Sequence, residues 1–413
     1  KFSPTRHLTV RQLALPIVAI DLSGSGKRMK LYFDDEGFDA QLQRTVGKCD
    51  AGMASVGECL YIASRIKPGD RDSWYHEWST FADGLETQAA AAELGGHTVS
   101  AASLRLRATE YYRQAFFWHR DNLDAKELKY AYRASVNAFR RALPHLRHSG
   151  RLLEGETPGY LFAPPGVGPF PTILHIGGYD STSEELYASA HLALDRGWAF
   201  VCLDGPGQGS VLYDRRVPLR PDWEHVLPGM FDLITGLPEV DAARIVLVGR
   251  SFGGLLAPRG AAGEPRLAAL IVDPGQYDMT SGMAARLGKL WQYVDEPAAK
   301  AQFDALLEIP PLRTLLGPRM VTNGVADPQA YFQDMCRYTN TELAPSIRCA
   351  SFVTDNETDS ISTGQGQQLY DAMTCAKTFR RFTQAEGAEG HCEGMAPIVF
   401  WTAAFDWLDT TVR

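Results

Sequence analysis

Residues 244–262, RIVLVGRSFGGLLAPRGAA, carry the strongest structural signal in this sequence. The apolar run 245–248 predicts a buried strand, and the residues after Gly254 predict a helix. Between them lies the motif Gly-x-Ser-x-Gly, whose small residues permit a sharp turn that lifts a serine hydroxyl above the edge of a sheet. The stretch therefore predicts that Ser251 is a nucleophile at a strand-to-helix turn. The alternative is a structural serine in a glycine-rich turn.

A nucleophilic serine needs a base and a carboxylate that orients the base. With this type of turn the expected chain order is serine, acid, histidine. Only one histidine, His391, follows Ser251, so it is the predicted base. The acid is expected just after the next-to-last predicted strand, where Asp355, Glu357 and Asp359 compete. We favour Asp359, because it lies on the loop expected to reach the histidine.

The oxyanion formed by attack of the serine needs two preorganised N–H donors. The first is expected to be the amide of Phe252, the residue after the nucleophile. The second is expected from residues 175–180, HIGGYD, where glycines allow the backbone to approach the substrate. We assign it to Tyr179, with Gly178 as the alternative donor and a residue beside the substrate. Arg250 and Arg259 are candidates for binding an acidic substrate, although we favour ion pairs inside the fold for both.

The remainder of the chain indicates the fold class and its domains. From residue 159 onward, short apolar runs alternate with helical stretches, which is typical of a parallel sheet with crossover helices. Residues 151–413 therefore predict an α/β domain with a mostly parallel sheet. Residues 1–150 predict an N-terminal helical cap domain. At residues 278–345 helical sequence interrupts the alternation of strands and helices, and this insertion predicts a helical lid over the site. The expected strands are 172–176, 199–203, 245–248, 269–272, 350–354 and 378–382.

Composition excludes several classes of function. The chain has 41 Lys and Arg against 49 Asp and Glu, so its net charge of −8 disfavours nucleic-acid binding. No apolar run approaches the ~20 residues needed to cross a membrane, and the first ten residues lack the apolar run of a secretion signal. A soluble cytoplasmic protein that binds neither membrane nor nucleic acid is therefore expected. Metal-ligand clusters are absent, and the GPGQG at 205–209 lacks dinucleotide-motif spacing, so neither metal nor cofactor is predicted.

These motifs together make the sequence resemble an α/β-hydrolase group that includes 2,6-dihydroxypseudooxynicotine hydrolase, fungal yellowish-green pigment hydrolases and FrsA-like proteins. The resemblance covers residues 70–410 and leaves the first seventy residues unmatched. The stretches that carry it are WYHEW, SAASLRLRATEYYRQAFF, HIGGYDSTSEE, LDGPGQG, GRSFGGLLAPRGAAGEPRLAA, NETD and EGHCEG.

The resemblance implies a function as well as a fold. It implies a triad of Ser251, Asp359 and His391, a homodimer, and hydrolysis of a carbon–carbon bond next to a carbonyl in a polyketide or aromatic diketone-like molecule. It also implies an acidic residue at Asp180, where glutamate is usual. A buried Asp180 with a raised pKa would polarise or protonate the leaving group, whereas the alternative is a carboxylate that caps the following helix.

Two other classes of function remain open from the sequence. The same triad serves esterases, lactonases, thioesterases and acyltransferases, because neither fold nor triad specifies the bond broken. A binding protein on the hydrolase scaffold is the other alternative, and the intact Ser, Asp and His set argues against it.

Overall fold

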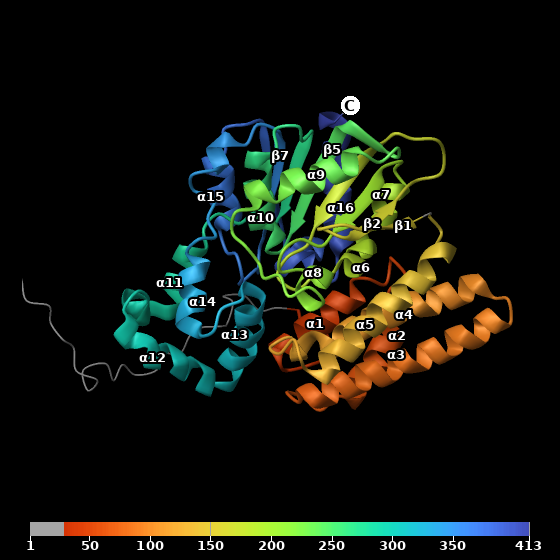
Figure 1. Ribbon diagram of the computed structural model, residues 1–413, viewed down its shortest axis with the longest axis horizontal. Coiled ribbons are helices and arrows are strands. Elements are labelled where there is room, and N and C mark those ends of the chain that lie inside the picture. Colours follow the sequence, from red (N-terminus) through yellow and green to blue (C-terminus); the bar gives the residue numbers. More distant parts are fainter. Residues whose placement is uncertain (1–28, 149, 413) are drawn as a thin grey trace, which may run out of the picture.

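The computed structural model describes residues 29–148 and 150–412, so the expectation about the first ten residues lies outside the described part. Its centre is an eight-stranded sheet in the order β1-β2-β4-β3-β5-β6-β7-β8 (Figure 1). The strands β3 to β8 are parallel, and the pairs β1·β2 and β2·β4 are antiparallel. The strands are β1 (Gly150–Leu153), β2 (Gly159–Phe162), β3 (Phe170–Ile176), β4 (Ala199–Leu203), β5 (Val240–Arg250), β6 (Ala269–Asp273), β7 (Ala350–Asn356) and β8 (Lys377–Phe382).

The six parallel strands are those that the sequence predicted, and the predicted fold class is confirmed. They are continuously apolar because helices cover both faces of the sheet: α9, α10 and α15 pack on one face, and α7 and α16 on the other. β1 and β2 were not predicted, because each has only four residues. The helices of this part are α6 (Ser183–Leu186), α7 (Ala190–Leu194), α8 (Gly209–Tyr213), α9 (Leu227–Thr235), α10 (Gly253–Gly263), α15 (Gln365–Ala372) and α16 (Pro397–Thr411).

The described residues before β1 form a helical layer with its own core. Trp74 and Trp78 are fully buried in this core, as their helical spacing suggests. The last helix of the layer ends at Ala142, and β1 begins at Gly150, next to the predicted domain boundary. The helices are α1 (Glu36–Val46), α2 (Val56–Arg65), α3 (Arg71–Leu94), α4 (Thr98–Phe116) and α5 (Lys126–Ala142).

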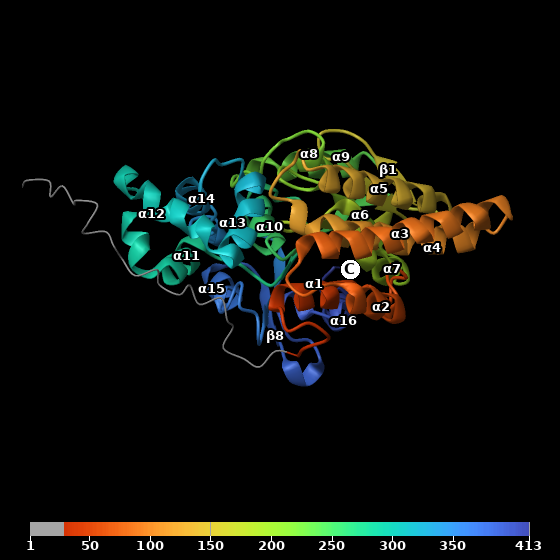
Figure 2. The ribbon, with the colours of Figure 1, turned by 90° about the horizontal axis from the view of Figure 1, so that it is seen from below.

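Residues 278–345 form a second helical layer between β6 and β7. Figure 1 shows it below the sheet and beside α1 to α5, and Figure 2 shows the same two groups of helices from below. Both groups contribute residues to one cavity, which the Ser251 turn at the carboxyl end of β5 also lines. The helices are α11 (Met279–Leu287), α12 (Lys300–Asp304), α13 (Pro310–Asn323) and α14 (Pro328–Met335). No helix of the described residues is long and apolar enough to cross a membrane.

Candidate active site

Ser251 sits in a strained turn between β5 and α10. Its φ angle is 57°, a left-handed conformation that L-residues seldom adopt. The turn is held by a hydrogen bond of 2.8 Å from the Ser251 amide to the carbonyl of Asp273. A Cβ atom at Gly249 would lie 2.2 Å from the carbonyl oxygen of Gly253, so only glycine lets the end of β5 lie this close to the start of α10. These contacts explain why the Gly-x-Ser-x-Gly spacing is needed here.

The three residues predicted as a triad form one chain of hydrogen bonds. Nε2 of His391 lies 2.8 Å from Oγ of Ser251, and Nδ1 of His391 lies 3.0 Å from Oδ2 of Asp359. The structure thereby distinguishes the three competing carboxylates. Asp355, the next-to-last residue of β7, accepts a hydrogen bond from the amide of Asn356, and Glu357 accepts one from the amide of Gln384.

The pKa values of Asp359 and His391 suit a histidine base that is oriented by an ionised carboxylate. Burial opposes ionisation of Asp359, but His391, Ser362 and the amide of Ile361 hold its pKa at about 2. Burial lowers the pKa of His391, but the Cys392 and Asp359 side chains outweigh burial and raise it well above the usual range. Ionised Asp359 therefore fixes the orientation of the imidazole and stabilises its protonated form.

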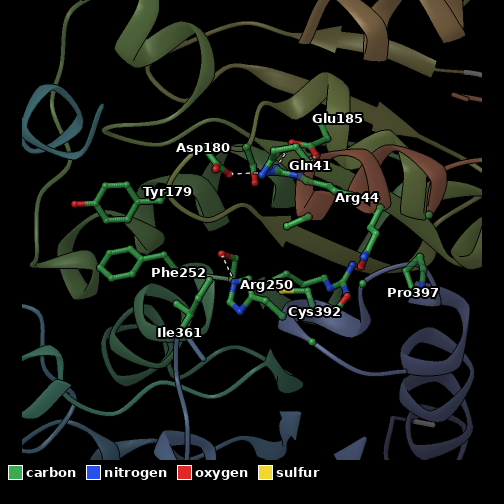
Figure 3. A pocket seen from close by; sticks show the side chains of 18 of the residues that line it. Gln41, Arg44, Tyr179, Asp180, Glu185, Arg250, Phe252, Ile361, Cys392 and Pro397 are labelled. Carbon is green, nitrogen blue, oxygen red and sulfur yellow. Dashed lines mark hydrogen bonds and ion pairs between the residues drawn. The ribbon is translucent and has the colours of Figure 1, made fainter. Parts of the chain in front are cut away.

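Two backbone amides next to Ser251 are available for an oxyanion. Within the described residues, the amides of Phe252 and Tyr179 donate no hydrogen bond, whereas the amide of Gly178 donates to Oγ of Ser181 at 3.3 Å. A Cβ atom at Gly178 would lie 2.9 Å from Oγ of Ser251, so glycine is required for this close approach. The side chains of Tyr179 and Phe252 contact each other beside the nucleophile (Figure 3).

Gln208 supports this loop and was not predicted. Its side-chain amide donates to the carbonyls of Gly177 at 2.6 Å and Gly178 at 3.3 Å. It comes from the GPGQG stretch, which the sequence excluded only as a dinucleotide site. The loop after β4 thus positions the loop after β3.

The structure does not support the prediction that Arg250 binds substrate. Its guanidinium donates to Asp273 at 2.6 Å and to Glu393 at 2.7 Å, and both carboxylates are fully buried. It also donates to the carbonyl of Cys392, next to His391. Arg250 lines the cavity, but its charge is neutralised within the fold. It holds the histidine loop against β6.

Asp180 also differs from both predictions made for it. Burial would raise its pKa, but Arg44 and Arg120 outweigh burial and lower it to about 2. The carboxylate accepts a hydrogen bond of 3.0 Å from Arg44, and Thr182 caps the following helix instead. Asp180 is therefore ionised and cannot donate a proton at neutral pH. The sequence could not predict this, because Arg44 lies 136 residues away in the unmatched N-terminal segment.

Asp180 belongs to a buried network of ion pairs that joins α1 and α4 to the loop after β3 (Figure 3). At its centre, Glu185 accepts two hydrogen bonds of 2.7 Å from Arg44 and one of 2.6 Å from Lys48. Glu110 of α4 pairs with Lys48 at 2.8 Å and with Arg113 at 2.7 Å. With Arg120, which pairs with Asp180 at 3.7 Å, the network contains four cationic and three anionic side chains. It attaches the N-terminal helices directly to the predicted oxyanion loop.

Glu185→Gln is expected to destabilise the protein strongly. It would leave Arg44 and Lys48 buried without their main counter-charge, which costs about 3–5 kcal/mol of unfolding free energy. Urea unfolding followed by tryptophan fluorescence measures the loss. Asp304→Asn is the control, because its pair with Lys300 is half exposed and such pairs contribute less than ~1 kcal/mol. Equal stability of the two variants would contradict the structural role of the network.

Ser251 and His391 lie on the wall of a cavity of about 650 Å³. The apolar part of its lining includes Phe252, Met283, Tyr331, Met335 and Ile361. Its charged part includes residues of α1, the loop after β3, α6, the end of β5, α11 and α13. This volume suits a small organic molecule rather than a polymer. Within the described residues, no group of three or more His, Cys, Asp or Glu is arranged to hold a metal ion.

Comparison with known proteins identifies the family. A family model described as esterase FrsA-like matches residues 68–275, and the model of the α/β-hydrolase family matches residues 173–397. The chain belongs to the α/β-hydrolase family, and the predicted resemblance is confirmed.

Particular relatives are named hydrolases. The 20-hydroxy-prefusarin hydrolase of Gibberella moniliformis is 36% identical over 266 residues, which span 61% of this chain and 63% of that protein. The hydrolase acrC of Aspergillus aculeatus is 28% identical over 78% of this chain and 83% of its own length. The match to the first of these relatives thus spans less than two thirds of its length.

The crystal structure of 2,6-dihydroxy-pseudo-oxynicotine hydrolase shares the fold with a TM-score of 0.68. Its sequence is 24% identical, and the match covers 89% of this chain and 95% of that chain.

Proposed function

We propose that this chain is a serine-dependent hydrolase that cleaves a carbon–carbon bond next to a carbonyl in a polyketide or aromatic diketone-like molecule. The observation that supports it best is the hydrogen-bonded series Ser251, His391 and Asp359, whose first two members line a cavity of about 650 Å³. The choice of bond rests on the motifs shared with carbon–carbon hydrolases of the family. The relatives named as hydrolases of a small molecule are consistent with a substrate of this size.

The proposed reaction begins when Oγ of Ser251 bonds to the substrate carbonyl carbon and its proton passes to Nε2 of His391. The amides of Phe252 and Tyr179 then stabilise the oxyanion. Collapse of the tetrahedral intermediate breaks the carbon–carbon bond, and its electron pair stays on the leaving carbon. That carbon must be stabilised as an enolate or an electron-rich ring, and the imidazolium of His391 protonates it. Water activated by His391 finally hydrolyses the acyl-serine ester.

Mass spectrometry of products formed in water enriched in oxygen-18 tests the bond that is cleaved. A 1,3-diketone should give one ketone and one acid, with the heavy oxygen in the acid. Ester analogues with the same acyl group provide the comparison. Cleavage of the esters without any cleavage of the diketones would replace the proposal with an esterase, lactonase or thioesterase function.

Asp180→Asn is expected to lower kcat/KM for esters and for diketones by the same factor. Because Asp180 is ionised and paired with Arg44, its role is to position the adjacent Tyr179 amide rather than to donate a proton. Displacement of the oxyanion loop should cost about 10- to 100-fold. The exposed Asp214→Asn serves as the control. A loss confined to the diketone would contradict the positioning role and favour direct action on the leaving group.

The resemblance also leads us to propose that the chain forms a homodimer. Sedimentation equilibrium would test this, with about twice the chain mass of 45.5 kDa as the expected result. A single species at the chain mass would contradict it.

A further inference from the structure

Two arginines on the lid side of the cavity, Arg286 of α11 and Arg319 of α13, form no ion pair within the described residues. They differ in this from the other arginines near the site. Arg44 and Arg250 each contact two carboxylates, and Arg113 contacts Glu110. Of the four arginines that line the cavity, Arg44 and Arg250 are therefore neutralised within the fold, whereas Arg286 and Arg319 have no carboxylate partner among the described residues.

Each of the two arginines is tied to a different part of the catalytic machinery. Arg286 donates to the carbonyls of Ser360 at 2.9 Å and Ile361 at 3.4 Å, which directly follow Asp359 in the chain. The guanidinium of Arg319 lies 5.9 Å from the centre of the Tyr179 ring, on the predicted oxyanion loop. Both arginines line the same cavity as Ser251, and they contact the loop of the acid and the loop of the oxyanion respectively.

The two positive charges repel each other in a partly buried setting. Burial and the charge of Arg319 both lower the pKa of Arg286. Asp359 also acts on Arg286 electrostatically, but its oxygens are occupied by His391, Ser362 and the amide of Ile361. A partly buried guanidinium pair without its own counter-ion is unfavourable until an anion binds.

We infer that Arg286 and Arg319 bind an anionic oxygen group of the substrate and select acidic substrates. The group has two oxygens that share one charge, as in a carboxylate or the ionised enol of a 1,3-dicarbonyl, because guanidinium matches such a pair of oxygens. The inference rests on the proposed function and adds the substrate class. A 1,3-dicarbonyl also suits the carbon–carbon reaction, because attack of Ser251 on one carbonyl of its keto form releases the other carbonyl fragment as an enolate.

A pair of p-nitrophenyl esters tests the selection of an anion. One is p-nitrophenyl hydrogen glutarate, whose acyl chain ends in a carboxylate, and the other is its neutral methyl ester. The wild type is expected to prefer the acidic ester. In Arg319→Gln the ratio of the two kcat/KM values should fall about tenfold, which corresponds to the loss of one charge-assisted hydrogen bond. Arg313→Gln, an exposed arginine on the same helix, should keep the wild-type ratio.

A second pair of substrates distinguishes an enolate from a carboxylate as the bound anion. It compares an enolisable 1,3-diketone with its 2,2-dimethyl analogue, which cannot form an enol. Loss of preference in Arg319→Gln for the diketones alone assigns the site to an enolate, and loss for the esters alone assigns it to a carboxylate. An unchanged ratio in both pairs overturns the inference.

Binding to Ser251→Ala separates this inference from the proposed function. Calorimetric titration with monomethyl glutarate and with dimethyl glutarate reports the arginine site without turnover. If Ser251 proves not to be the nucleophile, tighter binding of the acidic probe and its loss in the double variant with Arg319→Gln still support the site. Equal binding of both probes contradicts it, whatever the activity.

Discussion

Replacing Ser251 with alanine is expected to lower kcat by about 10⁴- to 10⁶-fold for any substrate of this protein. The reason is that Oγ of Ser251 is the only atom of the predicted triad that forms a covalent bond to the substrate. A residual rate from the oxyanion donors and the cavity should remain. Steady-state kinetics on esters and diketones measures the effect, and circular dichroism checks that the fold is unchanged.

Covalent labelling by a fluorophosphonate provides a second readout. The wild type should carry one label on Ser251, and the alanine variant should carry none. Ser346→Ala, an exposed serine far along the chain, should label and turn over like the wild type. A Ser251→Ala protein that keeps wild-type activity would end the nucleophile assignment and leave a binding role for the scaffold.

Asp359→Asn is expected to lower kcat by about 10⁴-fold, because an amide favours the wrong tautomer of the histidine and no longer stabilises its imidazolium. The geometry makes this variant specific, since Asp359 lies 3.0 Å from Nδ1 of His391. Asp355→Asn is the matched control, because Asp355 is also an aspartate and lies only four residues earlier, near the end of β7. Its activity should stay within tenfold of the wild type. The opposite ranking would transfer the role of the acid to Asp355.

The same variant should change the pH profile of the residual activity. The base must be neutral to accept the serine proton, so kcat/KM rises with pH through the pKa of His391. The carboxylate of Asp359 contributes to raising that pKa, so removing its charge should shift the rising limb to lower pH. A limb that does not move would indicate that Asp359 has no electrostatic effect on the base.

Much of the fold and the core of the candidate site could be read from local sequence. Parallel strands buried on both faces are continuous apolar runs, so the six of them were visible one at a time. Gly249 is required by its close contact with the carbonyl of Gly253, four residues later in the same turn. His391 could be assigned because no other histidine follows the nucleophile. Each of these features depends on short stretches of chain.

The charged residues could not be assigned in this way. Arg250 and Asp180 carry the charges expected of substrate-binding groups, but their partners Glu393 and Arg44 lie more than a hundred residues away in the chain. A charge that is paired inside the fold and a charge that awaits a ligand look alike in a sequence. The lid arginines illustrate the same limit, since nothing near Arg286 or Arg319 in the sequence distinguishes them from surface residues.

The sequence by itself therefore determined the hydrolase sheet, the turn at Ser251 and the identity of the histidine, because these depend on local periodicity, local sterics and chain order. The tertiary structure alone decided which carboxylate reaches the histidine, that Asp180 is ionised, and which arginines remain unpaired over the cavity. Those properties follow from distances between side chains that folding brings together from distant parts of the chain. Electrostatic interactions and pKa values depend on such distances and on burial, and neither is encoded in any single stretch of chain.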